Sequence, residues 1–302
     1  MTGIDRKSSA VSRRELLALG AGAATGIAGL RGAWARSAPR PGHRTGSFHF
    51  QPAGLREIRV YYALGAGDMR DATMVIVMHG DDRDAAYNRD VWAKLIQDKP
   101  FVVAAPLFTD ADFPGSRQYN QGGIQDEHGA VRPVAQWTFS YIEPLFLRMR
   151  AELSGRQSAY NLFGHSAGAQ FVHRYVELAP ASYLQRALAA NAGWYTMTDP
   201  AIDFPYGAGG VARSLFDWPT AFKRRLTVML GDQDILDDEN LRHDAGSDAQ
   251  GLTRWARGNT FFNAATSRAN SLGLPFNWDR VVVPGVGHQT NKMSASAIGL
   301  LV

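Results

Sequence analysis

The segment Gly164-His165-Ser166-Ala167-Gly168 constrains the fold of this chain more than any other part of the sequence. It fits the pattern G-x-S-x-G, which forms a sharp turn between a strand and a helix. The short apolar stretch 160–163 precedes it, and residues 169–178, with apolar side chains at helical spacing, follow it. Small residues are needed at both glycine positions because a Cβ there would crowd the neighbouring backbone. The motif therefore predicts a serine in a strained turn at the open end of a sheet.

Apolar runs and segments of helical spacing alternate along the rest of the chain. An unbroken apolar run such as Met74-Val75-Ile76-Val77-Met78 is typical of a strand buried on both faces of a parallel sheet. Strands are expected over residues 57–63, 74–78, 101–105, 160–163, 187–190, 226–230 and 281–283, and helices over 87–97, 137–153, 169–178 and 252–270. This order predicts an α/β fold with a mostly parallel central sheet and helices on both faces.

The first 35 residues differ in composition from the rest. Arg13-Arg14 precedes an uncharged stretch, residues 16–30, and Ala33-Trp34-Ala35 places small residues at the spacing that a signal peptidase reads. The pattern resembles a twin-arginine export signal with cleavage after Ala35. Its apolar stretch is shorter than the roughly 20 residues that span a bilayer. We therefore expect the twin-arginine export machinery as a partner, and a mature form that is periplasmic or secreted and does not span the membrane.

Three regions follow from this interpretation. Residues 1–35 are the expected export signal, residues 36–54, with scattered Pro and Gly, are the expected linker, and residues 55–302 are the expected folded domain. Residues 107–135 carry no periodic pattern, and loops of that length usually carry function or are mobile.

Charge and composition exclude several classes of function. The net charge is +4, but residues 1–35 hold five basic and two acidic side chains, which leaves +1 for the remainder and predicts no nucleic-acid partner. Cysteine is absent, so the chain has no thiol nucleophile and no thiolate metal site. No P-loop, H-E-x-x-H motif or dinucleotide glycine fingerprint occurs. We expect neither a metal nor a cofactor.

His288 is the predicted base for Ser166. A serine hydroxyl is a weak nucleophile unless a base takes its proton. Of the eight histidines, His288 follows the last expected strand, in Gly285-Val286-Gly287-His288-Gln289, and so completes the chain order Ser, Asp, His. His165 is interpreted as a packing residue inside the turn. The histidines at 43, 49, 128, 173 and 243 are interpreted as structural or solvent-facing.

The acid that orients His288 should follow a strand between Ser166 and His288. Leu230-Gly231-Asp232-Gln233-Asp234 offers two carboxylates, whose task is to fix the imidazole tautomer and stabilise the imidazolium. Asp234 is preferred because a strand followed by Gly-x-x-Asp places a carboxylate on the loop that faces the histidine. Asp232 remains the alternative. Asp237 and Asp238 are interpreted as solvated loop charges.

Two backbone N–H groups are expected to form an oxyanion hole. Ala167 follows the serine and supplies the first, and the turn His79-Gly80-Asp81, after the expected strand 74–78, supplies the second through Asp81. Arg83 either holds this turn by an ion pair or is simply exposed.

Four of these features together resemble the α/β-hydrolase family over residues 55–295. They are His79-Gly80, Gly164 to Gly168, Gly231 to Asp234 and Gly287-His288. Within the family, the chain looks most like exported hydrolases of the polyester-depolymerase and feruloyl-esterase kind. The resemblance implies a two-step acyl transfer through an acyl-enzyme on Ser166. The sequence departs from the pattern in lacking a His-Gly-Gly-Gly run and a starch- or polyester-binding module.

The expected function is hydrolysis of small or polymeric carboxylic esters. An amide or peptide hydrolase with the same triad is the alternative, because nothing in the motif distinguishes the two bonds. A binding protein that kept the fold without catalysis is the third hypothesis. Trp194 and Tyr195 are candidates for a substrate pocket, with residues 115–121 on its other side, although such aromatic side chains equally pack a cap segment.

Overall fold

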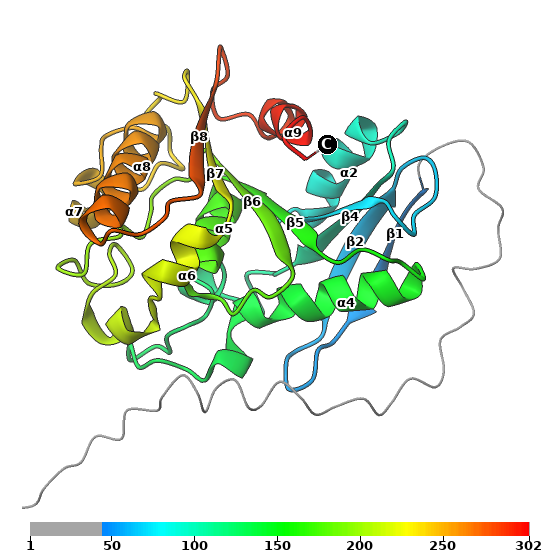
Figure 1. Ribbon diagram of the computed structural model, residues 1–302, viewed down its shortest axis with the longest axis horizontal. Coiled ribbons are helices and arrows are strands. Elements are labelled where there is room, and N and C mark those ends of the chain that lie inside the picture. The colour runs from blue at the N-terminus through cyan, green and yellow to red at the C-terminus, as the bar shows by residue number, and fades with distance from the viewer. Residues whose placement is uncertain (1–43, 302) are drawn as a thin grey trace, which may run out of the picture. The chain divides into compact units, whose positions relative to one another are not determined.

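The computed structural model describes residues 44–301, which build one eight-stranded sheet (Figure 1). The strands lie side by side in the order β1-β2-β4-β3-β5-β6-β7-β8. Their bounds are β1 Arg44–Phe50, β2 Ile58–Leu64, β3 Thr73–Met78, β4 Phe101–Leu107, β5 Tyr160–His165, β6 Leu184–Ala190, β7 Leu226–Gly231 and β8 Trp278–Val283. All seven strands that the sequence predicts are present.

Most neighbouring strands run parallel. From β4 through β3, β5, β6 and β7 to β8 every pair is parallel, whereas β1 with β2 and β2 with β4 are antiparallel. Parallel neighbours need a crossover, and helices supply it here. The predicted α/β class with a mostly parallel central sheet is confirmed.

Helices cover both faces of the sheet, as predicted. Side chains of β3 alternate between the two sides, so that Ile76 joins the core beneath α4, α5, α6 and α8, and Val77 joins the core beneath α2 and α9. Figure 1 shows α2 and α9 next to each other. The helix bounds are α2 Ala85–Leu95, α3 Gly115–Gln118, α4 Ile142–Glu152, α5 Ala167–Leu178, α6 Trp218–Lys223, α7 Ala245–Asp248, α8 Arg254–Ser271 and α9 Thr290–Ile298.

Part of the predicted linker is a strand. Residues 36–54 are predicted to form a linker, but β1 occupies Arg44–Phe50 and pairs with β2 along its whole length. The prediction is wrong for these residues because β1 lies at the sheet edge, where backbone pairing needs only one partly buried face. Gly46 interrupts the apolar pattern by which a strand is recognised in a sequence. A larger residue would nevertheless crowd the neighbouring strand, because a Cβ at this position would lie 2.4 Å from the Tyr62 hydroxyl oxygen on β2. The folded domain therefore begins before residue 55.

The sheet gathers the candidate residues at one edge. The parallel strands end at Met78, His165, Ala190, Gly231 and Val283, and the segments that follow these ends carry the predicted serine, base, acid and oxyanion turn. In α/β sheets, ligands bind beyond the carboxyl ends of the strands. The topology alone thus brings together segments that are far apart in the sequence.

No helix within residues 44–301 has both the length and the apolarity that crossing a membrane requires. The predicted export signal, its cleavage after Ala35 and the first part of the predicted linker lie outside the described residues.

Candidate active site

Ser166 stands in a strained turn between β5 and α5. Its backbone has φ 57° and ψ −120°, a region that residues with a side chain rarely occupy. A Cβ at Gly164 would lie 2.2 Å from the Gly168 carbonyl oxygen, and a Cβ at Gly168 would lie 2.3 Å from the Met78 carbonyl oxygen. Only glycine fits at either position, and the serine is half-buried at the first turn of α5.

The turn after β3 lies against this helix start. A Cβ at Gly168 would also lie 2.8 Å from the His79 carbonyl oxygen, so the backbone of His79 adjoins the first turn of α5. The first N–H groups of a helix have no partner within the helix and carry a partial positive charge. The N–H of Ala167 is one of these groups. The predicted donor Ala167 lies at this helix start, and the turn that carries the other predicted donor, Asp81, begins at His79 beside it.

His79 anchors the turn as a neutral imidazole. Its Nδ1 donates to the Gly80 carbonyl oxygen at 2.9 Å, and its Nε2 accepts from the Phe108 N–H at 3.1 Å, which fixes one tautomer. The ring stacks on Tyr119 at 4.4 Å between centroids, and the Tyr119 hydroxyl donates to the His79 carbonyl oxygen. Complete burial lowers the pKa of His79 to about 3; its hydrogen bond to Gly80 acts in the opposite direction, and the charge of Arg83 lowers the pKa further.

Arg83 also holds this turn, mainly through backbone carbonyl groups. Its guanidinium donates to the Phe108 carbonyl oxygen at 2.8 Å and to that of Gly115 at 3.2 Å, and lies 4.5 Å from the Tyr119 ring centroid. Its contact with the exposed Asp110 is longer, at 3.4 Å. Arg83 is therefore not simply exposed, and it holds the turn more through carbonyl groups than through the predicted ion pair.

Asp234 and His288 meet directly. The His288 Nδ1–H donates to Asp234 Oδ2 at 2.8 Å, and the Asp234 side chain is almost completely buried. A carboxylate at Nδ1 leaves Nε2 unprotonated in the neutral ring, which is the tautomer that a general base needs. Asp232 lies elsewhere, because its Oδ1 accepts from the Gly285 N–H at 2.7 Å. Of the two candidate acids, the structure places Asp234 at the histidine.

His288 lies beside the serine turn. Its ring centroid is 4.5 Å from that of His165, the residue before Ser166. The hydrogen bonds among residues 44–301 include the Asp234–His288 bond but none from the Ser166 hydroxyl. Catalytic hydrogen bonds are often long in enzymes without substrate and shorten once it binds. Two of the three predicted residues are therefore joined, and the third is a neighbour of the pair.

His165 is the packing residue that its place in the motif predicts. Its ring is buried, and its Nδ1 lies 3.0 Å from the Thr290 hydroxyl oxygen at the start of α9. Burial, reinforced by the nearby His288 and Arg254, holds the pKa of His165 well below the ordinary value. A neutral ring at this position adds no charge next to His288.

Asn191 is a positioning residue that no sequence motif singles out. It follows β6, has φ 50°, and is buried. Its side-chain amide donates to the Gly287 carbonyl oxygen at 3.0 Å, and its side-chain oxygen accepts from the Gly231 N–H at 2.8 Å. One carboxamide therefore ties the loop of the acid to the loop of the histidine. The only sequence signal is an Asn directly after a strand, since Asn tolerates positive φ better than most residues.

The proposed pocket residues are buried in this conformation. Trp194 is 2% exposed, with Arg174 at 4.0 Å and Arg242 at 5.3 Å from its ring centroid, and Tyr195 stacks on Phe261. Tyr119 and Asn120 in the segment 115–121 are buried as well. These side chains present almost no surface to a ligand here and pack the loops above α5 and α8.

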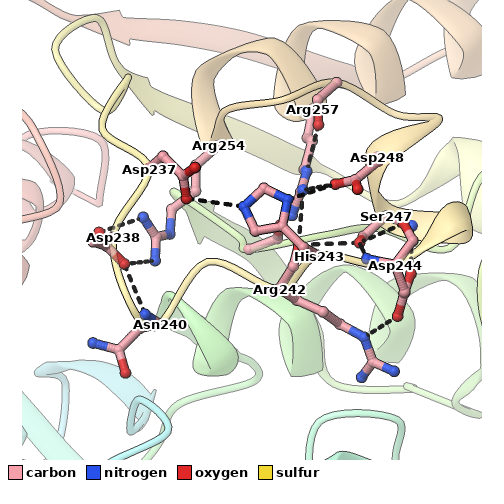
Figure 2. A network of polar contacts seen from close by, with 12 residues as sticks. Asp237, Asp238, Asn240, Arg242, His243, Asp244, Ser247, Asp248, Arg254 and Arg257 are labelled. Carbon is pink, nitrogen blue, oxygen red and sulfur yellow. Dashed lines mark hydrogen bonds and ion pairs between the residues drawn. The ribbon is translucent and has the colours of Figure 1, made fainter.

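The segment between β7 and α8, which includes α7, carries a network of charged side chains (Figure 2). His243 lies between two carboxylates, at 2.9 Å from Asp237 Oδ1 and 2.9 Å from Asp248 Oδ1. These two hydrogen bonds, that to Asp237 first, raise the pKa of His243. Asp238 accepts two hydrogen bonds from the buried Arg254, at 2.7 and 2.8 Å. Its interpretation as a solvated loop charge is wrong, because a partner from α8 lies beside it.

Two solved structures resemble this chain over most of its length. One is poly(aspartic acid) hydrolase-1 from Sphingomonas sp. KT-1, with 36% identity, a TM-score of 0.81, and coverage of 85% of this chain and 98% of the other. The second is LpqC, a poly(3-hydroxybutyrate) depolymerase from Bordetella parapertussis, with 31% identity, a TM-score of 0.80, and coverage of 85% and 88%.

More distant structures share the fold. An S-formylglutathione hydrolase from Agrobacterium tumefaciens is 14% identical, with a TM-score of 0.53 over 87% of this chain and 96% of the other. No family model matches the chain, and no curated protein matches it significantly.

We predict that Asn191→Gly lowers the reactivity of Ser166 by about tenfold to a hundredfold, since small misplacements of catalytic groups have effects of that order. Glycine tolerates the positive φ, so the variant removes the two hydrogen bonds without adding backbone strain. The measurement is the rate at which a fluorophosphonate labels the serine, with the urea midpoint as the control for folding. An unchanged labelling rate would contradict a positioning role.

We predict that His79 makes the protein less stable in acid. The pKa of His79 is about 3 in the folded chain and 6.5 in the unfolded chain, so only the unfolded state takes up this proton as the pH falls below 6.5. The free energy of unfolding should then decrease by up to about 1.4 kcal/mol per pH unit from this residue. Urea unfolding from pH 6.5 to about 4.5 should give a shallower slope for His79→Gln. Parallel curves for the two proteins would contradict this assignment.

Proposed function

The chain belongs to the α/β-hydrolase superfamily, and on that basis we propose that it hydrolyses carboxylic esters through a covalent acyl-enzyme on Ser166. The observation that carries the proposal is the Asp234–His288 hydrogen bond beside a serine with φ 57°. A serine at the strained turn, a histidine with one fixed tautomer and a buried carboxylate are the parts that this chemistry needs.

The first half of the proposed reaction forms the acyl-enzyme. The Ser166 Oγ attacks the ester carbonyl carbon while its proton passes to His288 Nε2. The carbonyl oxygen becomes an oxyanion, which accepts hydrogen bonds from the N–H groups of Ala167 and Asp81. The C–O bond to the alcohol then breaks, and the imidazolium of His288 gives its proton to the departing oxygen.

The second half releases the acid. A water molecule gives a proton to His288 Nε2 as its oxygen attacks the acyl carbon. The bond to Ser166 Oγ breaks, and the proton on His288 returns to that oxygen. Asp234 remains a carboxylate throughout and stabilises the imidazolium in both halves.

Hydrolysis of amide bonds is the second candidate function. The relative with 36% identity is named as a hydrolase of poly(aspartic acid), whose units are joined by amide bonds, whereas the relative with 31% identity is named as a depolymerase of a polyester. Both names point to polymeric substrates. The same triad serves either bond, because the leaving group differs only in whether His288 protonates oxygen or nitrogen.

We predict that a fluorophosphonate labels Ser166 in the full chain and that Ser166→Ala abolishes the label, as located by peptide mass spectrometry. Short-chain p-nitrophenyl esters, oligomers of 3-hydroxybutyrate and oligomers of aspartic acid would then separate the two candidate bonds. His288→Ala should lower the rate by about 10³-fold or more, because triad members act as a unit. A folded protein without a label would instead favour a binding protein of this fold.

We also propose export through the twin-arginine route, on the basis of residues 1–35. The prediction is that the full chain, expressed in a bacterium with this machinery, yields a periplasmic or secreted form whose sequence begins after Ala35. Replacing both Arg13 and Arg14 by Lys should retain the protein in the cytoplasm. N-terminal sequencing of each fraction makes the measurement, and equal export of the double variant would contradict the proposed route.

A further inference from the structure

One oxygen of the candidate triad acid is left without a hydrogen bond. Asp234 Oδ2 accepts from His288, but Oδ1 has no hydrogen-bond partner within the described part of the chain, although the side chain is only 1% exposed. A buried carboxylate normally requires either further hydrogen bonds or an opposite charge. The balancing group should therefore lie close to Oδ1.

Arg254 provides that charge from the first turn of α8. Its Nη1 lies 3.7 Å from Asp234 Oδ1, too far for a hydrogen bond but close enough for a strong attraction between two buried charges. The backbone N–H of Trp255, the next residue, donates to the Asp234 carbonyl oxygen at 3.1 Å. The start of α8 is thereby fixed to both the backbone and the side chain of the acid.

Asp238 holds the guanidinium in this position. Arg254 Nη1 donates to Asp238 Oδ2 at 2.7 Å and Nη2 donates to Oδ1 at 2.8 Å, the paired geometry in which Arg binds a carboxylate most tightly (Figure 2). The Asn240 N–H donates to the same carboxylate at 3.0 Å and fixes it in turn. Because Arg254 directs its hydrogen bonds to Asp238, it leaves Asp234 free to accept from His288.

We propose that Arg254 and Asp238 are a positioning pair that holds Asp234 against His288. The inference rests on the proposed serine-hydrolase function and extends it to two residues outside the triad. Arg254 balances the charge of the buried acid, and Asp238 keeps Arg254 from competing with the histidine for it.

Electrostatic coupling between the pair and the serine turn supports this role. The pKa of Asp238 is lowered, first by its hydrogen bond with Arg254 and to a smaller extent by His288. Arg254 in turn contributes to the lowered pKa of His165, after burial and His288. Asp234 from the β7–α8 loop and His165 from the end of β5 contact His288. Arg254 and Asp238 lie one step farther away, with Arg254 beside Asp234 and Asp238 paired with Arg254. The charge on α8 therefore lies beside the acid that binds the base.

Removing each member of the pair should move the pH profile in opposite directions. Without the Arg254 cation, the His288 imidazolium is more stable, so the acid limb of kcat/KM should move to higher pH in Arg254→Gln by about half to one pH unit. In Asp238→Asn the cation loses its partner and turns to Asp234, so the acid limb should move to lower pH by a similar amount and kcat should fall.

The experiment measures kcat/KM for the best ester or amide substrate between pH 4 and 9, together with the titration midpoint of the His288 ring by NMR. Asp237→Asn is the matched control, because the same substitution one residue earlier removes a carboxylate that binds His243 rather than Arg254. Its midpoint should equal that of the unmodified protein. Arg254→Lys keeps the positive charge, so the titration midpoint of its His288 ring should equal that of the unmodified protein. Its kcat should nevertheless stay below that of the unmodified protein.

Shifts of opposite sign for Arg254→Gln and Asp238→Asn would support the proposal. Shifts of the same sign, or midpoints equal to that of Asp237→Asn, would overturn it even if both variants lose rate, since a merely structural role lowers the rate at every pH. If Arg254→Gln does not fold, the comparison of Asp238→Asn with Asp237→Asn decides. Failure of the unmodified protein to hydrolyse any substrate would contradict the proposed function, whereas the NMR midpoints would still test the pair.

Discussion

The close approach of α5 to the end of β3 is the contact from which the geometry of the candidate site follows. The backbone of Gly168 touches the carbonyl groups of Met78 and His79, so no side chain fits between the helix start and the strand. Ser166 has its positive φ two residues before this contact, and His79, at the start of the 79–81 turn, lies beside the first turn of the helix. The strained serine and the turn predicted to supply an oxyanion donor thus meet at a single packing contact.

Burial then determines how the ionisable groups behave. His79 and His165 lose their water and are held neutral, so they brace the site without placing a charge next to His288. Asp234 is equally buried but has an imidazole on one oxygen and a guanidinium near the other. Neutral histidines and a balanced carboxylate keep the local charge small, which leaves His288 as the side chain that changes protonation during the proposed reaction.

The loop between β7 and α8 joins the sheet to this electrostatic arrangement. It follows Gly231, the last residue of β7, which is fixed by Asn191, and it leads to the first turn of α8, where Arg254 meets Asp238. Between them, His243 holds Asp237 and Asp248 in place (Figure 2). A long loop fixed at both ends and in its middle can present one carboxylate accurately, as a flexible loop could not.

Local periodicity and glycine positions were enough to predict the α/β class, the strand-turn-helix around Ser166 and the chain order of serine, acid and histidine. They could not reveal β1, whose pairing with β2 is an edge contact between weakly patterned segments. The Gly-x-x-Asp pattern favoured Asp234 but left Asp232 open, and no pattern identified Asn191 and Arg254 or the partner of Asp238. Those roles depend on which distant side chain lies within 3 to 4 Å, and only the packing of loops from β6, β7 and α8 decides that.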